Sequence, residues 1–196
     1  MKLHKPALEN DLVRLDVLKE THRETIRQSE ATESMWEWLP VISTGTSFDS
    51  YVDTCLAAGQ TDEFVPFVVF DKSTGQFAGL AAYENVSRLH RRLGINFIWH
   101  PPDLRGTVIV PATQLALLER ALAVRIRRVE YYLPTENERA IRSVERLGAR
   151  QEGVLRSFVR SASGNWSDIA VLSLVGDEIK AATLLLQDRI RQMQLA

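Results

Sequence analysis

The sequence predicts an α+β fold, with a mostly antiparallel sheet and helices packed against it. Runs of aromatic and β-branched residues at 64–70 and 76–86 are joined by turn residues at 71–75, a pattern typical of a hairpin. A helical pattern between two later strands adds one parallel pair, because a helix-linked crossover returns the chain in the same direction. A second hairpin followed by an amphipathic helix closes the chain.

In the first half, strand-like residues at 12–18 precede a polar helix, which a capping box of Thr21 and Glu24 opens. Phe48, Val52 and Cys55 have helical spacing, so a second helix is expected to end near residue 59. Strands are expected at 64–70, 76–86 and 91–99, and two prolines at 101–102 stop the last of them.

In the second half, Pro111 fits the first turn of a helix that follows a loop at 105–110. A strand at 127–133 leads to a helix at 136–147, for which Thr135 is the expected N-cap and Gly148 the expected stop. Hairpin strands at 150–160 and 165–175 precede a final helix that begins at Asp177.

The composition predicts one domain over residues 1–196, since 45% hydrophobic and 25% charged residues are typical of a globular chain. No apolar run is long enough to span a membrane, so no membrane association is expected. A net charge of −1 argues against a nucleic-acid binder. The single Cys55 forms no internal disulfide, which predicts a cytoplasmic protein. The histidines and the cysteine have no metal-ligand spacing, so no metal is expected.

Four segments together resemble one enzyme family. Residues 137–149, from Asn137 to the Leu-Gly-Ala at 147–149, resemble a helix of the GCN5-related N-acetyltransferases (GNAT), particularly the group that acetylates ribosomal-protein N-termini. Residues 8–15, 35–40 and 153–168 resemble the first strand, the tryptophan segment and the closing hairpin of that family. The resemblance runs over about residues 8–180. It implies a three-layer fold with a splayed central strand pair, acetyl-CoA as co-substrate, and an amine or peptide acceptor.

The loop at 105–110 is the expected cofactor site. Backbone N–H groups that lead into a helix N-terminus bind anions, and a pyrophosphate suits such a loop. In the family this loop holds the pyrophosphate, and Arg105 matches its first position. Val108 and Val110 replace small residues, which predicts either an altered loop path or weaker binding of the cofactor. The predicted cofactor contacts are Ile98, Trp99, Arg105, Gly106, Thr107, Val108, Ile109, Val110, Asn137 and Ala140.

The resemblance is weaker for proton transfer. Many relatives carry a glutamate where this chain has Gly94, and a serine where it has Ala140. Glu84 is the candidate base in their place, or else a solvent-facing carboxylate, and Ser143 is the candidate acid, although it is offset from the face of Ala140. His90 and His100 flank the strand at 91–99 and are further candidates, or else ordinary surface residues.

Aromatic residues are the candidates for acceptor binding. Trp36 and Trp38 lie in the segment that borders the acceptor cleft in relatives, and Tyr83 neighbours Glu84. Trp36 could equally anchor a loop to the sheet.

Three functions remain open. The favoured one is an acetyl-CoA-dependent N-acetyltransferase that acts by direct attack on the thioester. The alternative is a catalytically degenerate module of the same fold that binds CoA or another ligand. The third is an oligomerisation domain, and a possible homo-oligomer, because the final helix has a long apolar stripe; that stripe could instead cover the protein's own sheet.

Overall fold

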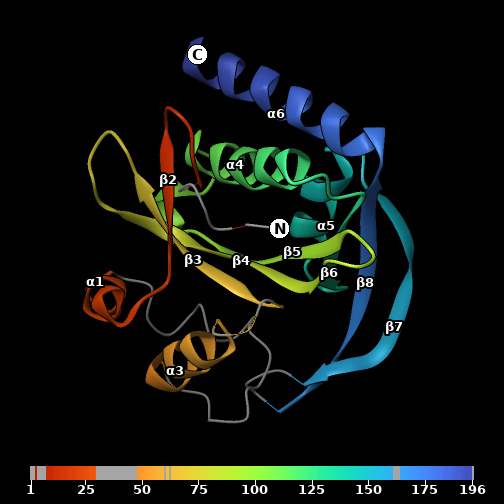
Figure 1. The fold of residues 1–196 in the computed structure, drawn as a ribbon, viewed down its shortest axis with the longest axis horizontal. Helices are drawn as coiled ribbons and strands as arrows, with labels where there is room; N and C mark the ends of the chain where they lie inside the picture. The colour runs from red at the N-terminus through yellow and green to blue at the C-terminus, as the bar shows by residue number, and fades with distance from the viewer. Residues whose placement is uncertain are drawn as a thin grey trace.

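The computed structural model describes residues 3, 8–29, 48–59, 61, 63–160 and 164–195. Eight strands form one sheet in the order β1-β2-β3-β4-β5-β6-β8-β7 (Figure 1). Neighbouring strands are antiparallel except for β5 and β6, which are parallel. The predicted α+β class and the single parallel pair are therefore confirmed.

The elements follow the expected order along the chain. The strands are β1 Leu8–Glu9, β2 Val13–Val17, β3 Val65–Asp71, β4 Phe77–Ser87, β5 Arg92–Trp99, β6 Arg128–Pro134, β7 Arg150–Arg160 and β8 Trp166–Val175. The α-helices are α1 Arg23–Gln28, α3 Phe48–Ala58, α4 Ile109–Ala123, α5 Glu138–Glu145 and α6 Asp177–Leu195, with short 3₁₀ turns at Glu20–His22 and Pro102–Leu104.

Helices cover both faces of the sheet, which makes three layers (Figure 1). Successive strand residues point to opposite faces, so Phe67 joins the larger core together with Leu117 of α4, while Val68 joins a smaller cluster together with Val52 of α3. Tyr83 belongs to the larger core. The sheet therefore has one face under α4 and another under α3.

The apolar stripe of α6 is buried within the chain. Ile179, Leu186 and Ile190 belong to the same core as the apolar side chains of α4, and Gln187 of α6 donates a hydrogen bond to Glu119 at 3.2 Å. The stripe thus covers the molecule's own helix α4, so it no longer supports an oligomerisation domain. None of the described helices combines the length and the apolar character that crossing a membrane requires.

Two predicted helix caps are wrong, and one predicted helix start is confirmed. The turn at residues 19–22 closes through Lys19 N–H, which donates to His22 Nδ1 at 3.1 Å, and not through Thr21. Helix α4 begins at Ile109, so Pro111 lies in its first turn, as expected. Helix α5 begins at Glu138 and its N-cap is Asn137, because a side-chain oxygen must reach the N–H of N2 or N3, and the side chain of Asn137 accepts from Ala140 N–H.

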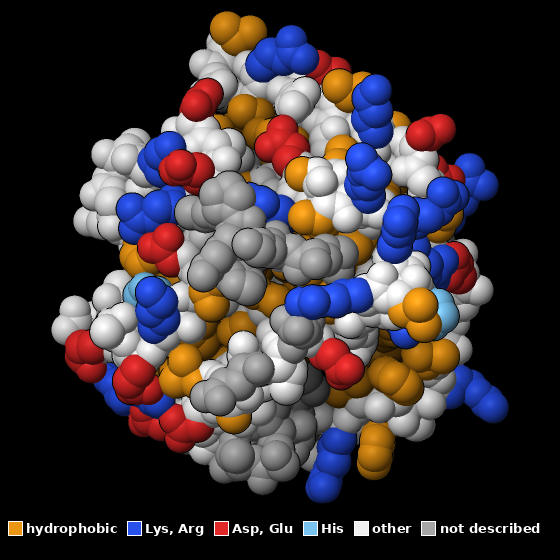
Figure 2. All heavy atoms as spheres, viewed as in Figure 1, with side chains coloured by type: hydrophobic (Ala, Val, Ile, Leu, Met, Phe, Trp, Pro, Cys, Tyr) orange, Lys and Arg blue, Asp and Glu red, His pale blue; other side chains and the backbone are white. Residues whose placement is uncertain are grey.

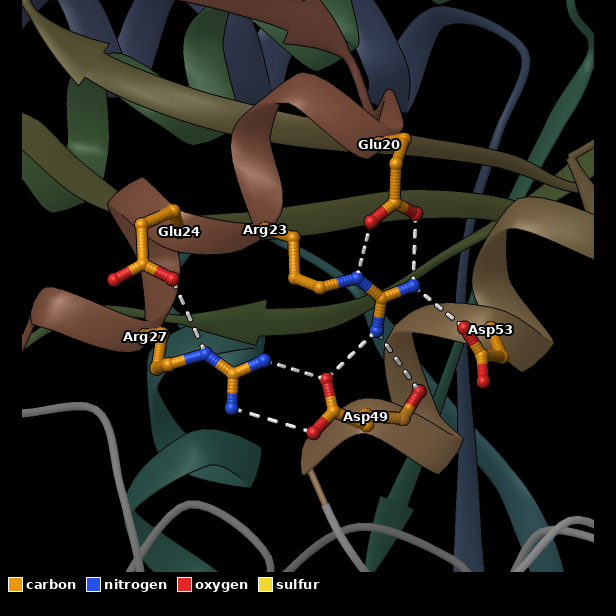
Figure 3. Close-up of polar contacts among 6 residues, drawn as sticks. All are labelled: Glu20, Arg23, Glu24, Arg27, Asp49 and Asp53. Atoms are coloured by element: carbon orange, nitrogen blue, oxygen red, sulfur yellow. Dashed lines mark hydrogen bonds and ion pairs between the residues drawn. The ribbon is translucent and has the colours of Figure 1, made fainter.

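Charged side chains gather where α1 and α3 meet, at the lower left of Figure 2. Arg23 contacts Glu20 at 2.5 Å, Asp49 at 2.9 Å and Asp53 at 2.5 Å (Figure 3). Arg27 contacts Asp49 at 2.7 Å. Two arginines thereby tie α1 to the first turns of α3, and these bonds raise the pKa of Arg23.

Candidate active site

The sheet opens between its two parallel strands. The pairing of β5 with β6 covers Arg92–Arg128, Leu93–Val129 and Gly94–Glu130, and ends there, although both strands continue. Helix α4 follows β5 and helix α5 follows β6, so both helices begin at the same edge of the sheet. Ligands of sheets with parallel strands bind outside the carboxyl ends of those strands, at the point where neighbouring strands separate. We call this opening the β5–β6 fork.

A bulge bends β5 at the fork. Ala82 pairs with Asn96 and Leu80 with Trp99, so between these pairs one residue of β4 opposes two of β5. Phe97, inside the bulge, has a φ of 55°, a conformation that non-glycine residues rarely adopt. The backbone of Ile98 and Trp99 follows directly, and the Trp99 ring stacks on Phe77 with 6.3 Å between centroids. The bulge thus turns the end of β5 at Ile98 and Trp99, two of the predicted cofactor contacts.

His100, at the end of β5, is fixed as a neutral side chain. Its Nδ1 lies 2.7 Å from the carbonyl oxygen of Ala78, to which it donates, and burial lowers its pKa to about 4. Such a group is a weak base near neutral pH. His90 is exposed on the turn at the opposite end of β5 from the bulge. The structure therefore favours neither histidine as the base.

The predicted phosphate loop leads directly into α4. The Arg105 Nε donates to the carbonyl oxygen of His100 at 3.1 Å, and Gly106 has a φ of 88°. Thr107 Oγ1 donates to Leu104 O at 2.7 Å and lies 3.4 Å from Ile109 N. The loop is thus a tight turn that ends in a helix N-terminus.

The two valines lie where the loop enters α4. Val108 has φ −63° and ψ −20°, which is ordinary right-handed helical backbone, and Val110 lies inside α4. β-Branched residues adopt this conformation without strain and disfavour positive φ, so the expected departure of the loop from its path in relatives stays a prediction. Ile109 is 5% exposed and packs into the core, so only its backbone can face a ligand.

Asn137 and Ala140 lie together at the start of α5. Asn137 Oδ1 accepts the N–H of Ala140 at 3.2 Å, which leaves Asn137 Nδ2 as the donor available to a ligand. Ser143 is half-buried one turn further on, and no hydrogen bond of the described residues joins it to Glu84. The geometry brings Asn137 to the edge where α4 begins and gives Ser143 no special contact.

A row of polar residues crosses the fork on the face covered by α3. Glu84 pairs with Gly94, Gly94 with Glu130 and Glu130 with Ser173, so these four residues lie side by side across four strands. Glu130 is 5% exposed and is held by Arg128 at 2.5 Å and by Arg92 at 3.3 Å.

Glu84 is the carboxylate of this row that has no ion pair among the described residues. It is half-buried and accepts a hydrogen bond from Asn96 Nδ2. Burial raises its pKa, the Asn96 hydrogen bond lowers it, and the charge of Glu130 raises it, with a net upward shift. An upward shift of the pKa makes a carboxylate a stronger proton acceptor.

The remaining predicted site residues divide between the core and the undescribed part of the chain. Tyr83 is fully buried on the opposite face from Glu84, and its hydroxyl donates to Leu117 O at 2.6 Å. The structure therefore does not bring Tyr83 to an acceptor, because successive strand residues face opposite sides. Trp36 and Trp38 lie outside the described residues.

Sequence reasoning missed Glu130, which belongs to the row, and Asn96, which donates a hydrogen bond to Glu84. Asn96 differs from the glycine that is usual in the family, which was the available signal, but its role depends on a contact with a different strand. Glu130 comes into the row only through the parallel register of β5 and β6.

Comparison with known proteins agrees with this architecture. The family model of the acetyltransferase (GNAT) domain matches residues 13–150. A comparison with curated proteins finds no match by sequence. A GCN5-related N-acetyltransferase from Brucella melitensis superimposes with a TM-score of 0.81 at 23% identity, over 95% of this chain and 86% of that one.

Two further solved structures are similar. The ribosomal-protein-S5-alanine acetyltransferase from Vibrio fischeri has a TM-score of 0.70 at 17% identity, over 87% of this chain and 97% of that one. The spermidine N-acetyltransferase from Vibrio cholerae, solved with CoA and spermine, has the same TM-score and identity, over 87% of this chain and 99% of that one. At these identities the likeness is one of fold, and the bound CoA is consistent with acetyl-CoA as co-substrate. The domain model covers most of the sequence, and the chain therefore belongs to the GNAT family of N-acetyltransferases.

Proposed function

We propose that the chain transfers the acetyl group of acetyl-CoA to an amine, either a protein or peptide N-terminus or a small amine. The observation that carries this is the position of Glu84, a half-buried carboxylate with a raised pKa in the row that crosses the base of the β5–β6 fork. A general base at that place serves an acceptor amine that reaches the fork from the α3 face.

In this proposal the pyrophosphate of acetyl-CoA binds at residues 105–110, where Arg105 supplies a positive charge and the first turn of α4 supplies backbone N–H groups. The first turn of α4 contains no acidic residue that would repel a phosphate. The pantetheine arm enters the fork, beside Asn137 Nδ2 and Ala140. The backbone of Ile98 and Trp99, after the bulge, polarises the thioester carbonyl.

The reaction is a direct transfer. The amine nitrogen attacks the thioester carbon, so one C–N bond forms and one C–S bond breaks. Glu84 accepts the proton that the nitrogen loses, and CoA leaves with its sulfur as the thiol once that sulfur has gained a proton. Ser143, the candidate donor of that proton, has no contact in its favour, and solvent serves in its place.

The proposed acceptor is an amine, and the rest of the acceptor molecule is not assigned. The names of similar structures cover an alanine of ribosomal protein S5 and the polyamine spermidine. Both fit the proposed chemistry because the base acts on the nitrogen and not on the rest of the acceptor.

The test is thiol release from acetyl-CoA with a panel of peptide N-termini and small amines, across pH 6–9. Glu84→Gln is expected to lower turnover about 10²–10⁴-fold and to leave the affinity for CoA in calorimetry unchanged. Glu9→Gln, an exposed carboxylate on β1 at the far side of the sheet, is the matched control and keeps full turnover.

Two outcomes contradict the proposal. If the wild-type protein binds CoA but releases no thiol with any acceptor, the degenerate binding module of this fold is the better description. If Glu84→Gln keeps full turnover, the chain is an enzyme in which a water relay or the free amine handles the proton.

A further inference from the structure

Asn96 spans the β5–β6 fork with its side chain. It lies on β5 two residues after Gly94, the last residue that pairs with β6. Its Oδ1 accepts the backbone N–H of Tyr132 at 3.0 Å, so a side chain takes the place of the missing ladder bond between the strands. Asn96 is 8% exposed, which leaves its amide little freedom to leave this position.

The partners fix the orientation of the Asn96 amide. A backbone N–H can only donate, so the Asn96 atom beside Tyr132 N is the oxygen, and the nitrogen faces Glu84. Nδ2 can only donate, and Glu84 Oε1 accepts. The Asn96 amide therefore links the backbone N–H of Tyr132 on β6 to the carboxylate of Glu84 on β4.

Gly94 leaves the room that this contact needs. A Cβ placed on Gly94 would lie 3.0 Å from Glu84 Cγ and 3.1 Å from Asn96 Nδ2. Both distances are tighter than ordinary van der Waals contact, so a side chain at position 94 would push the two partners apart. The absence of a side chain at Gly94 thus allows Asn96 to contact Glu84.

The charged groups around Glu84 leave Asn96 as the group that favours its ionised form. On β6, Glu130 and Tyr132 face the same side, and Glu130 is held by Arg92 and Arg128. From α3, Tyr51 lies close enough for the charge of Glu84 to raise its pKa. Burial and the charge of Glu130 raise the pKa of Glu84, whereas the hydrogen bond from Asn96 lowers it and so favours the ionised form.

We propose that Asn96 is the positioning residue for the base of this enzyme: it holds the Glu84 carboxylate at the fork, from the neighbouring strand, in place of a carboxylate at position 94. This inference rests on the proposed function. It goes beyond it by assigning a role to a residue that contacts neither the acetyl donor nor the acceptor in that proposal. A donor on the carboxylate keeps Glu84 ionised at lower pH and fixes which of its oxygens faces the fork.

The first test is the pH profile of kcat/KM for Asn96→Ala. Loss of the donor is expected to move the acidic limb of the profile upward by on the order of one pH unit, the scale of a hydrogen bond to a charged group. The KM for acetyl-CoA stays unchanged. Asn96→Asp keeps the shape and the bond to Tyr132 N–H but turns an oxygen toward Glu84, so it moves the limb further upward and serves if Asn96→Ala does not fold.

Asn10→Ala is the matched control. Asn10 also bridges two elements through its amide: its Nδ2 donates to Ala112 O at 2.9 Å and its Oδ1 accepts from Val13 N–H at 3.0 Å. This substitution lowers stability and leaves the acidic limb in place. In a Glu84→Gln background, Asn96→Ala has no further effect on the pH profile, because the group that it positions is gone.

An acidic limb that is identical in the wild type, Asn96→Ala and Asn96→Asp overturns the inference. The carboxyl signal of Glu84 in nuclear magnetic resonance gives an independent readout, since its titration must move upward in both variants. If no amine is acetylated at all, the proposed function fails, and this titration still decides whether Asn96 controls Glu84. A Glu84 signal that titrates identically in all three proteins overturns the inference in that case too.

Discussion

Gly94 lies directly opposite Glu84 in the β4–β5 ladder, and the space that its missing Cβ leaves is bordered by Glu84 Cγ at 3.0 Å. The absence of a side chain on one strand thus accommodates a carboxylate from the next. Position 94, where the resemblance leads one to expect a glutamate, thus has a carboxylate from the neighbouring strand beside it.

Gly94→Ala is expected to lower both stability and turnover. The added methyl group meets Glu84 Cγ and Asn96 Nδ2, and overpacking of this kind costs about 1–3 kcal/mol. Gly153→Ala, on the exposed strand β7, is the control because no heavy atom lies within 4 Å of its added Cβ. Urea denaturation and thiol release measure the two effects. Equal stability of the two variants would show that Glu84 and Asn96 move aside freely.

Glu84→Gln is expected to stabilise the fold at high pH. The pKa of Glu84 in the folded protein is raised above its ordinary value of 4.5, mainly by burial, so the folded state binds the proton more tightly than the unfolded state. The contribution of Glu84 is then complete below about pH 4.5 and is lost as the pH rises through the folded-state pKa. Glutamine keeps the acceptor for Asn96 Nδ2 and carries no charge.

The measurement is the free energy of unfolding of the wild type and Glu84→Gln at pH 4 and at pH 8. The variant should gain stability relative to the wild type between these two values, provided that both remain folded. A constant difference between the two proteins would show that the protonation of Glu84 is not linked to folding. Glu9→Gln, an exposed carboxylate, controls for the general effect of removing one negative charge.

The sequence predicts the elements well and the site less well, for one physical reason. The strand expected at 150–160 coincides with β7, and the helix expected from Asp177 is α6, because local spacing and turn residues determine such elements. The fork depends on where the pairing of β5 and β6 stops, which is a long-range property. The contact of Asn96 with Glu84 depends in addition on the β4–β5 register, so neither residue's role can be derived from its neighbours in sequence.

The N-cap of α5 shows the same limit at short range. Thr135 and Glu138 have the spacing of a capping box, yet Thr135 N–H donates to Asp168 O on β8. The pairing of β6 with β8 continues to Pro134, so the chain is still held by the sheet at the residue where the helix was expected to begin. Asn137 is the next residue that can cap, and it does. Tertiary pairing here overrides a local signal.

His100 is expected to make the fold less stable in mild acid. Its folded-state pKa of about 4 lies below its ordinary value of 6.5, so the unfolded state binds the proton more tightly. Stability from this group is complete above pH 6.5 and is lost as the pH falls toward 4, by at most about 3 kcal/mol.

His100→Asn keeps a donor for the Ala78 carbonyl oxygen and should flatten this part of the stability profile. His90→Asn, on the exposed turn, should leave the slope as it is. Thermal unfolding at intervals of half a pH unit measures the slope, and equal slopes for the wild type and His100→Asn would contradict the burial of a neutral imidazole.

Arg23→Ala is expected to destabilise the protein more than the loss of an ordinary surface arginine. Its side chain is only 17% exposed and contacts Glu20, Asp49 and Asp53, so its removal breaks the connection between α1 and α3 and leaves three carboxylates near one another. Exposed ion pairs contribute little, but a shared, partly buried guanidinium raises the cost to on the order of 1 kcal/mol. Arg191→Ala, which breaks the exposed pair of Arg191 and Asp188, is the control and should have almost no effect.

Arg23→Lys should recover little, since an ammonium group cannot present a planar fork to several carboxylates. The loss should shrink in 1 M salt, because screening weakens both the ion pairs and the repulsion that remains without them. A loss for Arg23→Ala that matched Arg191→Ala at low salt would show that apolar packing alone holds α1 against α3.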